Sequence, residues 1–594
     1  HGHETFEMLL LEMAGLVDMA AGRFQDAARH LDESLSRAKV MKFPPVIEEV
    51  GLNRAALRYI QGEFQQAIGD LQAMLPVIRE TPNREVEGVA LTYIGASQLA
   101  LGQVEPAAAS LLAARAVYER LDDVAQRSWL VDTLIGRLER RRGRPDAALA
   151  SYRSALGAIE RVRAGTGLDG ANQIGSIAMR QDAFVETADL LVDMGRPDDA
   201  LDIVESFKAR TLLDALALSS QRYTGVADPP ARVAAGAMGP LVPADSAIVE
   251  FLLGPERSYA WVVTGERNTV VPLAGRGAIE RAVEALRQTV SSPVSALNAA
   301  RAAAAFDAAS RGVAQLVIEP IRSALGPATR LVIVPDGALA YVPFEALVEH
   351  RNAGTGYLSD RVDISYAPSV AVLAALGSRG RSAAERSLLA LGDPTYGTAP
   401  GALAPLTASR DEVTAIAALF PAETRRVLLG ADAREDTLLA DRLSQFRYVH
   451  LAAHGVLDEQ RPARSGIALV PTPGGGDNDG VLRVDEIAAL HFDADLVTLS
   501  ACASGLGRVV NGEGVVGLSR AFLMAGSRSV VMSLWNVNDA ATSAFMKAFY
   551  GALAQGQSRT AALREARRAL QQSARRQWRH PYYWAAFTLI GQSD

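Results

Sequence analysis

The sequence comprises 594 residues, with 60 Lys and Arg against 67 Asp and Glu and a formal net charge of −7. This length exceeds the roughly 250–300 residues at which a single hydrophobic core stops growing, so two or more domains are predicted. The acidic balance argues against nucleic acid as a direct partner, and no apolar run reaches the roughly 18 residues that a membrane span needs.

The chain contains a single cysteine, Cys502. A disulfide within the chain is therefore impossible, which is typical of a reducing compartment, and a cytoplasmic location is predicted. No export signal is visible at the start of the sequence. The sequence opens on His1 rather than on Met, which leaves open that it is a fragment of a longer protein.

Residues 1–215 are dominated by strong helix formers, and a short phrase recurs in which a Gly precedes an Ala by about five positions. A Gly can end one helix in the left-handed conformation, and a small Ala lets the next helix pack closely. The first three glycines are 40 residues apart, a period that predicts stacked helix hairpins in a tetratricopeptide-like solenoid. A plain helical bundle is the alternative. The copies start at Gly22, Gly62, Gly102, Gly143 and Gly195 and reach Ala27, Ala67, Ala107, Ala147 and Ala200.

Residues 216–243 contain prolines and polar residues in the manner of a linker. From residue 244 onward, short apolar runs alternate with helical segments, which predicts an α/β domain with a mostly parallel sheet. The predicted organisation is a helical-repeat region at 1–215, a linker at 216–243 and an α/β domain at 244–594. The apolar runs are Ser246–Leu253, Tyr259–Val263, Leu331–Pro335, Ser387–Gly392, Tyr448–Ala452, Leu496–Ser500 and Val530–Leu534.

Two of these runs lead directly into residues that can do chemistry. His454 follows the run Tyr448–Ala452, and Cys502 follows the run Leu496–Ser500. If the two runs are neighbouring parallel strands, both side chains meet at one edge of the sheet. An imidazole beside a thiol can raise its thiolate fraction and later protonate a leaving amine. The backbone N–H groups of Gly455 and Cys502 are then natural donors to an oxyanion.

Three other interpretations of these residues remain open at this point. Cys502 can be an inert buried thiol, and His454 a hydrogen-bonded structural histidine. A metal site would join His450, His454 and His491, although no Glu or Cys accompanies them at the spacing that metalloproteases use. A serine hydrolase is weakly indicated, because Ser519 lacks the strict Gly-x-Ser-x-Gly elbow.

An ordered set of phrases in the C-terminal half resembles the CHAT domain. This is the caspase-like domain that occurs with tetratricopeptide repeats and is a relative of caspases and separases. The segment Glu205–Asp214 is similar to the last repeat helix that commonly leads into this domain. The resemblance implies a caspase-like catalytic core at about residues 385–594. The matching phrases are Val342–Leu347, Ala452–Gly455, Leu499–Gly505, Gly512–Gly514, Leu518–Phe522 and Ser533–Asp539.

By this resemblance His454 is the general acid/base and Cys502 the nucleophile of a cysteine endopeptidase, with no cofactor and no metal. Acidic residues select Arg or Lys substrates in some relatives, which suggests Asp539, Trp535 and Glu513 as residues of the specificity pocket. Asp539 has a structural alternative, because an Asp commonly caps a helix such as the one expected from Ala540. Glu513 can likewise serve to order the loop after Cys502.

The leading prediction is a cysteine endopeptidase that cleaves a protein or peptide substrate, with a preference for a basic residue before the cut. A protein partner or regulator would bind the groove of the repeat region, and neither nucleic acid nor a membrane is expected as a direct partner. The alternatives are a non-catalytic scaffold and an acyl hydrolase that uses the same dyad. The glycine-rich segment Pro471–Gly480 is expected to be a mobile connection.

Overall fold

The computed structural model divides the chain into two compact units, His1–Ser176 with Asp182–Gly195 and Ile177–Gln181 with Arg196–Asp594. The expected boundary at residue 215 marks where the repeat-like sequence ends, whereas the compact units divide at Gly195–Arg196. The structure describes residues 2–81, 83–121, 125–165, 180–224, 233–351, 354–382, 387–396, 403–440, 442–456, 458, 462–472, 479–500, 508–510 and 514–594.

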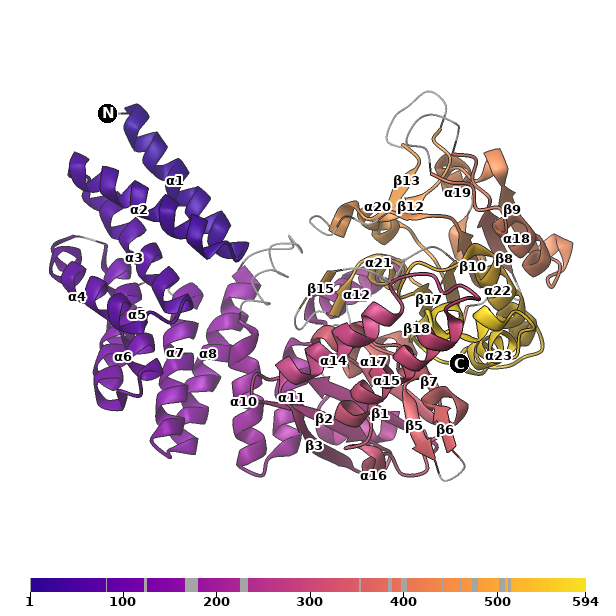
Figure 1. The fold of residues 1–594 in the computed structure, drawn as a ribbon, viewed down its shortest axis with the longest axis horizontal. Coiled ribbons are helices and arrows are strands. Elements are labelled where there is room, and N and C mark those ends of the chain that lie inside the picture. The colour runs from indigo at the N-terminus through magenta and orange to yellow at the C-terminus, as the bar shows by residue number, and fades with distance from the viewer. Residues whose placement is uncertain are drawn as a thin grey trace. The chain divides into compact units, whose positions relative to one another are not determined.

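The first unit is helical, as its composition predicts, and consecutive helices pack side by side as hairpins (Figure 1). We call this unit the repeat arm. Its helices are α1 (Gly2–Ala20), α2 (Phe24–Met41), α3 (Pro44–Ile60), α4 (Phe64–Glu80), α5 (Arg84–Ala100), α6 (Val104–Tyr118), α7 (Ala125–Arg141), α8 (Pro145–Gly165) and α10 (Gln181–Asp193).

The recurring glycines end helices in the way the sequence predicts. All five have a positive φ, between 70° at Gly143 and 80° at Gly62, a region that favours glycine. After Gly22, the N–H of Arg23 bonds back to the carbonyl of Asp18 at 2.8 Å, so the end of α1 is satisfied. The alanines five positions after each glycine are fully buried; they are Ala27, Ala67, Ala107, Ala148 and Ala200. The fourth position is therefore Ala148, and the expected Ala147 is exposed.

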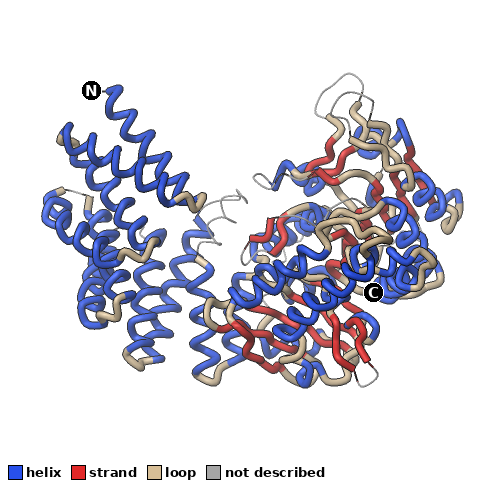
Figure 2. The backbone as a smooth tube through the Cα atoms, in the orientation of Figure 1, coloured by secondary structure: helices blue, strands red, loops and turns tan. Residues whose placement is uncertain are grey.

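The second unit begins with α11 (Pro197–Phe207) and α12 (Arg210–Thr224), so helix continues beyond residue 215 into the segment expected as linker. Further helices alternate with strands along the rest of the chain (Figure 2). They are α13 (Ala235–Met238), α14 (Arg276–Thr289), α15 (Ala299–Val317), α16 (Arg322–Leu325), α17 (Val370–Ser378), α18 (Ser409–Ala417), α19 (Glu435–Ala440), α20 (Val484–Ala489), α21 (Leu518–Met524), α22 (Asp539–Ala554), α23 (Arg559–Gln571) and α24 (Pro581–Trp584).

The second unit is built on one large sheet, whose described strands have the order β3-β2-β1-β4-β7-β18-β17-β14-β10-β8-β9. Neighbours are parallel from β1 to β18 and again from β17 to β9, while β17 and β18 are antiparallel. The predicted mostly parallel sheet is thus confirmed. Its strands are β1 (Ser246–Leu252), β2 (Arg257–Val263), β3 (Asn268–Ala274), β4 (Arg330–Val334), β7 (Asp363–Tyr366), β8 (Leu388–Gly392), β9 (Arg425–Leu429), β10 (Tyr448–Ala452), β14 (Leu496–Leu499), β17 (Ser529–Ser533) and β18 (Phe587–Gly591).

Three small antiparallel sheets accompany the large one. The sheet of β11, β12 and β13 follows directly on β10 and frames the residue after that strand. The small sheets consist of β11 (Gly455–Val456), β12 (Gly466–Ala468) and β13 (Val481–Arg483), of β15 (Arg508–Val510) and β16 (Gly514–Val516), and of β5 (Val348–Arg351) and β6 (Gly354–Tyr357).

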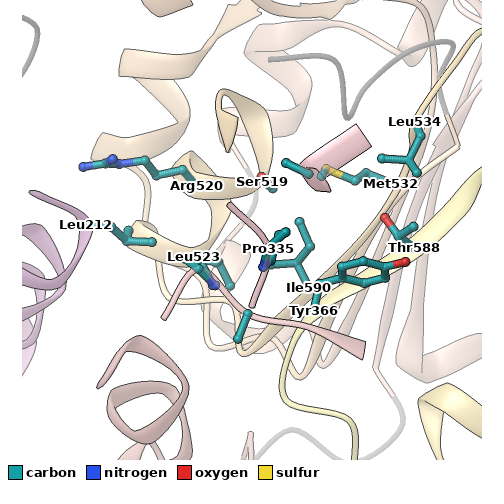
Figure 3. Close-up of a pocket in the computed structure, with 13 residues that line it drawn as sticks. Leu212, Pro335, Tyr366, Ser519, Arg520, Leu523, Met532, Leu534, Thr588 and Ile590 are labelled. Atoms are coloured by element: carbon teal, nitrogen blue, oxygen red, sulfur yellow. The ribbon is translucent and has the colours of Figure 1, made fainter. Parts of the chain in front are cut away.

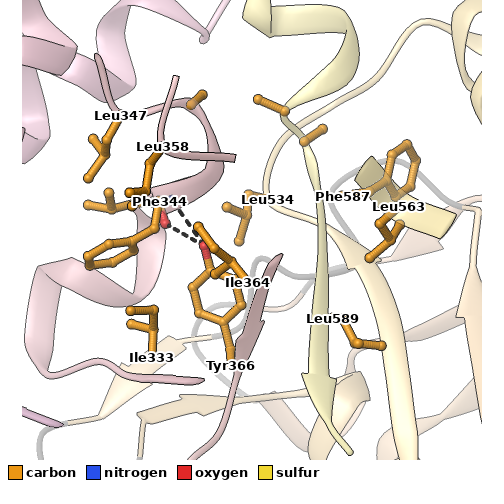
Figure 4. Packing of buried hydrophobic residues seen from close by; sticks show 14 of the residues in the cluster. Ile333, Phe344, Leu347, Leu358, Ile364, Tyr366, Leu534, Leu563, Phe587 and Leu589 are labelled. Carbon is orange, nitrogen blue, oxygen red and sulfur yellow. Dashed lines mark hydrogen bonds between the residues drawn. The ribbon is translucent and has the colours of Figure 1, made fainter. Parts of the chain in front are cut away.

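Helices cover both faces of the large sheet, and successive strand residues face opposite layers. In β17, Val531 belongs to the core beneath α14, α15, α22 and α23, while Val530 and Met532 belong to the core beneath α12, α20 and α21. The first core surrounds Tyr366, whose hydroxyl accepts the N–H of Phe344 at 3.0 Å (Figure 4). Each fully buried aliphatic or aromatic side chain contributes about 1.5–3 kcal/mol, so these two layers fix the strands that carry the site.

Among the helices that the structure describes, none has both the length and the apolar character that crossing a bilayer would require.

Candidate active site

His454 follows the carboxyl end of β10, in the centre of the parallel part of the sheet. β10 lies between β8 and β14 and runs parallel to both. His450 is the register partner of Thr498, and the N–H of Ser500 bonds to the carbonyl of Leu451 at 2.9 Å. The two runs that precede His454 and Cys502 are therefore neighbouring parallel strands, as the sequence predicts. Cys502 itself lies outside the described residues, and so does Glu513.

The half-buried ring of His454 is held by a backbone carbonyl. Its Nε2 lies 2.7 Å from the carbonyl oxygen of Ala404. A carbonyl can only accept, so Nε2 carries a proton in this contact. In a neutral ring, Nδ1 is then the nitrogen with a free lone pair. The geometry therefore selects the tautomer in which Nδ1 can act as a base.

Tyr396 fixes the backbone on either side of this ring. Its hydroxyl accepts the N–H of His454 at 3.2 Å and donates to the carbonyl of Ala468 at 3.1 Å. The two rings lie 5.4 Å apart at 45°. Burial raises the pKa of Tyr396 to about 12, although the His454 N–H lowers it, so the phenol keeps its proton. No pattern in the sequence marks Tyr396, because it lies 58 residues before His454 and outside the phrases that resemble the CHAT domain.

The N–H of Gly455 points away from the small sheet. The N–H of Ala468 bonds to the carbonyl of His454 at 2.8 Å, and the Tyr396 hydroxyl joins the His454 N–H to the Ala468 carbonyl, so His454 and Ala468 occupy a hydrogen-bonded position of the ladder. Bonded and non-bonded pairs alternate along an antiparallel ladder, so the next pair, Gly455 with Ile467, is non-bonded. β11 is the edge strand among the described strands of this sheet. The Gly455 N–H is consequently directed away from β12.

Asp539 binds the same segment of backbone that contacts His454. Its Oδ2 accepts the N–H of Ala408 at 2.7 Å. Burial raises the pKa of Asp539, as does the charge of Glu412, while the bond from Ala408 and the nearby His454 lower it. The segment Leu403–Ala408 is thus held by His454 at Ala404 and by Asp539 at Ala408. The capping alternative for Asp539 is not observed, because the side chain of Asn538 caps α22 by accepting the N–H of Ala541.

Trp535 is buried, with 8% of its surface exposed. Its indole N–H donates to the carbonyl of Tyr582 at 2.9 Å. The indole therefore belongs to the packed core of the domain, and its N–H is already engaged.

His450 contacts Glu412 rather than the histidines with which a metal site would join it. It is fully buried, and its Nε2 lies 2.8 Å from Oε1 of Glu412. Its ring meets that of Tyr550 edge to face at 5.3 Å. In the part of the chain that the structure describes, no group of three or more His, Cys, Asp and Glu residues could hold a metal ion.

Ser519 is buried within α21, so it is not presented as a serine-hydrolase nucleophile would be. It lines a cavity of about 50 Å³ between α21 and the central strands (Figure 3). Apolar side chains such as Leu523, Met532 and Ile590 form most of its wall, with Arg520 at one side. Neither His454 nor Asp539 reaches it. Among the described residues, those of the candidate site do not line this cavity.

Residues 307–592 match the family model of the CHAT domain. Tetratricopeptide repeat protein 28 of Mus musculus is 28% identical over 334 residues, 47% of this chain and 13% of that protein. The Homo sapiens protein of the same name is 26% identical over 341 residues, again 47% and 13%. The chain therefore spans about an eighth of the length of these relatives.

A solved structure of the Saccharomyces cerevisiae separase–securin complex covers 99% of this chain and 53% of its own, at 10% identity and a TM-score of 0.48. The strand order of the large sheet defines the α/β fold of the second unit. The family model covers the strands from β4 to β18 with their helices, whereas β1, β2 and β3 precede it, and residues 307–592 match a CHAT domain, as the phrases in the sequence predict.

Proposed function

We propose that this protein is a cysteine endopeptidase in which Cys502 attacks a peptide carbonyl and His454 moves the proton. The observation that supports this most is the 2.7 Å contact between His454 Nε2 and the Ala404 carbonyl, at the end of a strand whose parallel neighbour leads to Cys502. His450 and Thr498 are register partners in the neighbouring strands. His454 is four residues beyond His450, and Cys502 is four residues beyond Thr498.

His454 would act through Nδ1. The Ala404 carbonyl holds the proton on Nε2, so Nδ1 can take the thiol proton of Cys502 as the sulfur attacks. The same proton then passes to the leaving amine as the C–N bond breaks, and the imidazolium that forms in between is stabilised by the carbonyl. Water, deprotonated by Nδ1, hydrolyses the resulting thioester and restores the thiol.

The Gly455 N–H is suited to the oxyanion of the tetrahedral intermediate, together with the N–H of Cys502. Its direction away from β12 supports this role, because the N–H is not used in the ladder with that strand. One well-aimed donor of this kind is worth about 3–4 kcal/mol of transition-state stabilisation.

Asp539 would favour a basic residue before the cut. Its carboxylate binds the segment Leu403–Ala408 at Ala408 and is near enough to His454 for their charges to interact. A pocket that this carboxylate lines would carry negative charge. Trp535 would form the floor of this pocket, and Glu513 would contribute from the loop after Cys502. A negatively charged pocket discriminates Arg and Lys from uncharged side chains by charge complementarity.

The repeat arm would bind a protein partner that regulates the peptidase, since stacked hairpins present extended surfaces to peptides and proteins. We propose further that the repeats occupy residues 1–215, that residues 216–243 link them to the domain at 244–594, and that the catalytic core of this domain is at about 385–594. A cytoplasmic location is in keeping with the single cysteine of the sequence.

The test compares hydrolysis of a peptide library by the wild type, Cys502→Ala and His454→Ala. We expect cleavage that both substitutions abolish, with the products reporting the preferred residue. His491→Ala, an exposed histidine in the same unit, is the matched control and should cleave as the wild type does. A wild type that binds peptides without turnover, and whose Cys502 reacts with a peptide electrophile no faster than a free thiol, would identify a non-catalytic scaffold instead.

A further inference from the structure

The repeat arm contains a groove of about 540 Å³ between α1, α3 and α5, which lie next to one another (Figure 1). We call it the acidic groove. Its walls combine apolar side chains with carboxylates and amides. The lining residues are Leu16, Pro44, Pro45, Glu48, Glu49, Leu52, Asn53, Ala56, Thr81, Asn83, Glu85, Val86, Val89 and Tyr93.

Glu48 is the least satisfied group in this groove. Only 6% of its surface is exposed, and its Oε1 has no hydrogen-bond partner among the described residues. Burial raises the pKa of Glu48 above its usual value. A buried carboxylate oxygen without a donor costs about 1–3 kcal/mol or more, so a donor brought by a ligand would recover that free energy.

Two further glutamates lie near the acidic groove, Glu49 in its lining and Glu12 against its lining residue Asn53. Glu49 lies beside it in α3 and is exposed. Glu12 of α1 is 4% exposed and accepts the side-chain N–H of Asn53 at 2.8 Å. Burial and, to a smaller extent, the charge of Glu49 raise the pKa of Glu12 to about 7, against the lowering effect of Asn53. Glu12 and Glu49 therefore interact through their charges, while Glu48 and Glu49 line the groove together.

Three aspartates of the arm, in contrast, have a cation partner. Asp18 is paired with Arg23, Asp32 with Arg54, and Asp70 with Arg58. No such pairing exists for Glu12, Glu48 or Glu49 within the described part of the arm. Glu48 is thus a buried carboxyl of the acidic groove that has no cation partner among the described residues of the arm.

We propose that the acidic groove binds a linear segment of a partner protein through a Lys or Arg side chain that meets Glu48, with the exposed Glu49 supplying further negative charge. Apolar residues next to the basic one would pack on Leu52, Val86 and Tyr93. The proposal rests on the proposed role of the arm in binding a protein partner and gives that partner its chemistry. Nucleic acid does not fit, because its phosphates would face the same negative charge.

The test uses full-length protein carrying Cys502→Ala, so that a bound peptide cannot be cleaved. The probes are four octapeptide libraries of mixed Leu, Ala and Val with Arg, Lys, Gln or Glu fixed at one central position. We expect the Arg and Lys libraries to bind at least about tenfold more tightly than the Gln library, the scale of a close charge pair at an interface, and the Glu library to bind most weakly.

Glu48→Gln should reduce the advantage of the Arg library over the Gln library to about threefold or less. Its melting temperature should match or exceed that of the parent, because the change removes a buried charge that has no partner. That second readout separates loss of binding from loss of folding. Glu80→Gln, an exposed glutamate of α4 that does not line the groove, should bind all four libraries as the parent does.

Equal binding of the Arg and Gln libraries, or an unchanged preference in Glu48→Gln, would overturn the proposal. Neither outcome depends on catalysis, because the measurement is binding to a Cys502→Ala chain. Absence of hydrolysis by the wild type would contradict the proposed peptidase activity while leaving this binding result intact.

Discussion

The ring of His454 and the carbonyl of Ala404 are 2.7 Å apart, Nε2 to O, although 50 residues separate them in the sequence. This contact determines which ring nitrogen can accept a proton. It also ties the histidine to the segment Leu403–Ala408, whose other end is bonded to Asp539 at Ala408. The proposed base and the proposed specificity residue are therefore positioned by one short stretch of backbone.

Tyr396→Phe should weaken catalysis by loosening the backbone around His454. The change keeps the ring contact but leaves the His454 N–H and the Ala468 carbonyl without the hydroxyl that joins them. An unpaired buried polar group costs about 1–3 kcal/mol, so we expect a lower melting temperature and a kcat/KM about tenfold lower. Tyr59→Phe in the repeat arm is the control and should change neither. A wild-type kcat/KM in the Tyr396→Phe enzyme would show that this hydroxyl does not help to position His454.

Asp539→Asn should remove the preference for a basic residue without unfolding the protein. An Asn oxygen can still accept the Ala408 N–H, and Asn538 still caps α22, so only the charge is lost. We expect kcat/KM for Arg and Lys peptides to fall about 10- to 100-fold, while values for uncharged residues change little. The exposed Asp411→Asn on α18 is the matched control. Retention of full basic preference in Asp539→Asn would exclude Asp539 from the specificity pocket.

The raised pKa of Asp539 predicts that the preference for basic substrates depends on pH. Its pKa is raised, chiefly by burial, so it gains a proton at a higher pH than an ordinary Asp. As the pH falls through that value, the pocket loses its negative charge and the advantage of Arg over Gln substrates should shrink. The measurement is the ratio of kcat/KM for an Arg and a Gln peptide from pH 8 to pH 4. In Asp539→Asn that ratio should be flat.

The strands that carry the site could be predicted from sequence, whereas the contacts that orient it could not. The runs before His454 and Cys502 are apolar and end in small residues, and such patterns depend on residue type alone. The acceptor at Ala404 is a backbone carbonyl, which any residue supplies, so no residue pattern marks it. The lack of a partner for Glu48 could not be predicted either. An amphipathic pattern shows which face of a helix is buried, but not whether a neighbouring helix supplies a cation.

Glu345→Ala should strongly destabilise the CHAT domain. Glu345 is fully buried in the phrase Val342–Leu347, where its carboxylate binds Arg567 at 2.9 Å and the hydroxyl of Tyr366 at 2.7 Å. Arg567 also donates to the carbonyl of Phe587, in a strand of the central sheet. Removing one partner of a buried ion pair leaves the other charge buried, at a cost of about 3–5 kcal/mol. Chemical denaturation would measure this loss, with the exposed Glu565→Ala on α23 as the control that should stay within about 0.5 kcal/mol of the wild type.

Glu250→Gln should change how stability depends on pH. Glu250 of β1 is fully buried beside Glu205 of α11, and its Oε1 lies 3.4 Å from the Lys208 Nζ. Glu205 also accepts the N–H groups of Val370 and Ala371, at 2.8 and 2.9 Å, at the start of α17. Burial raises the pKa of Glu250 well above its usual value, and the charge of Glu205 raises it further against the effect of Lys208.

A carboxyl whose pKa is higher in the folded state holds a proton that the unfolded chain releases. Its contribution to stability is therefore present below the unfolded pKa and is lost as the pH rises toward the folded pKa, at about 1.4 kcal/mol per pH unit. The Gln amide can donate to Glu205 as the protonated acid does, without titrating. We expect the melting temperature of Glu250→Gln to exceed that of the wild type by an amount that grows from pH 5 to pH 8. Glu256→Gln, an exposed neighbour just before β2, should follow the wild type at every pH. A constant difference between Glu250→Gln and the wild type across this range would mean that Glu250 does not exchange its proton on unfolding.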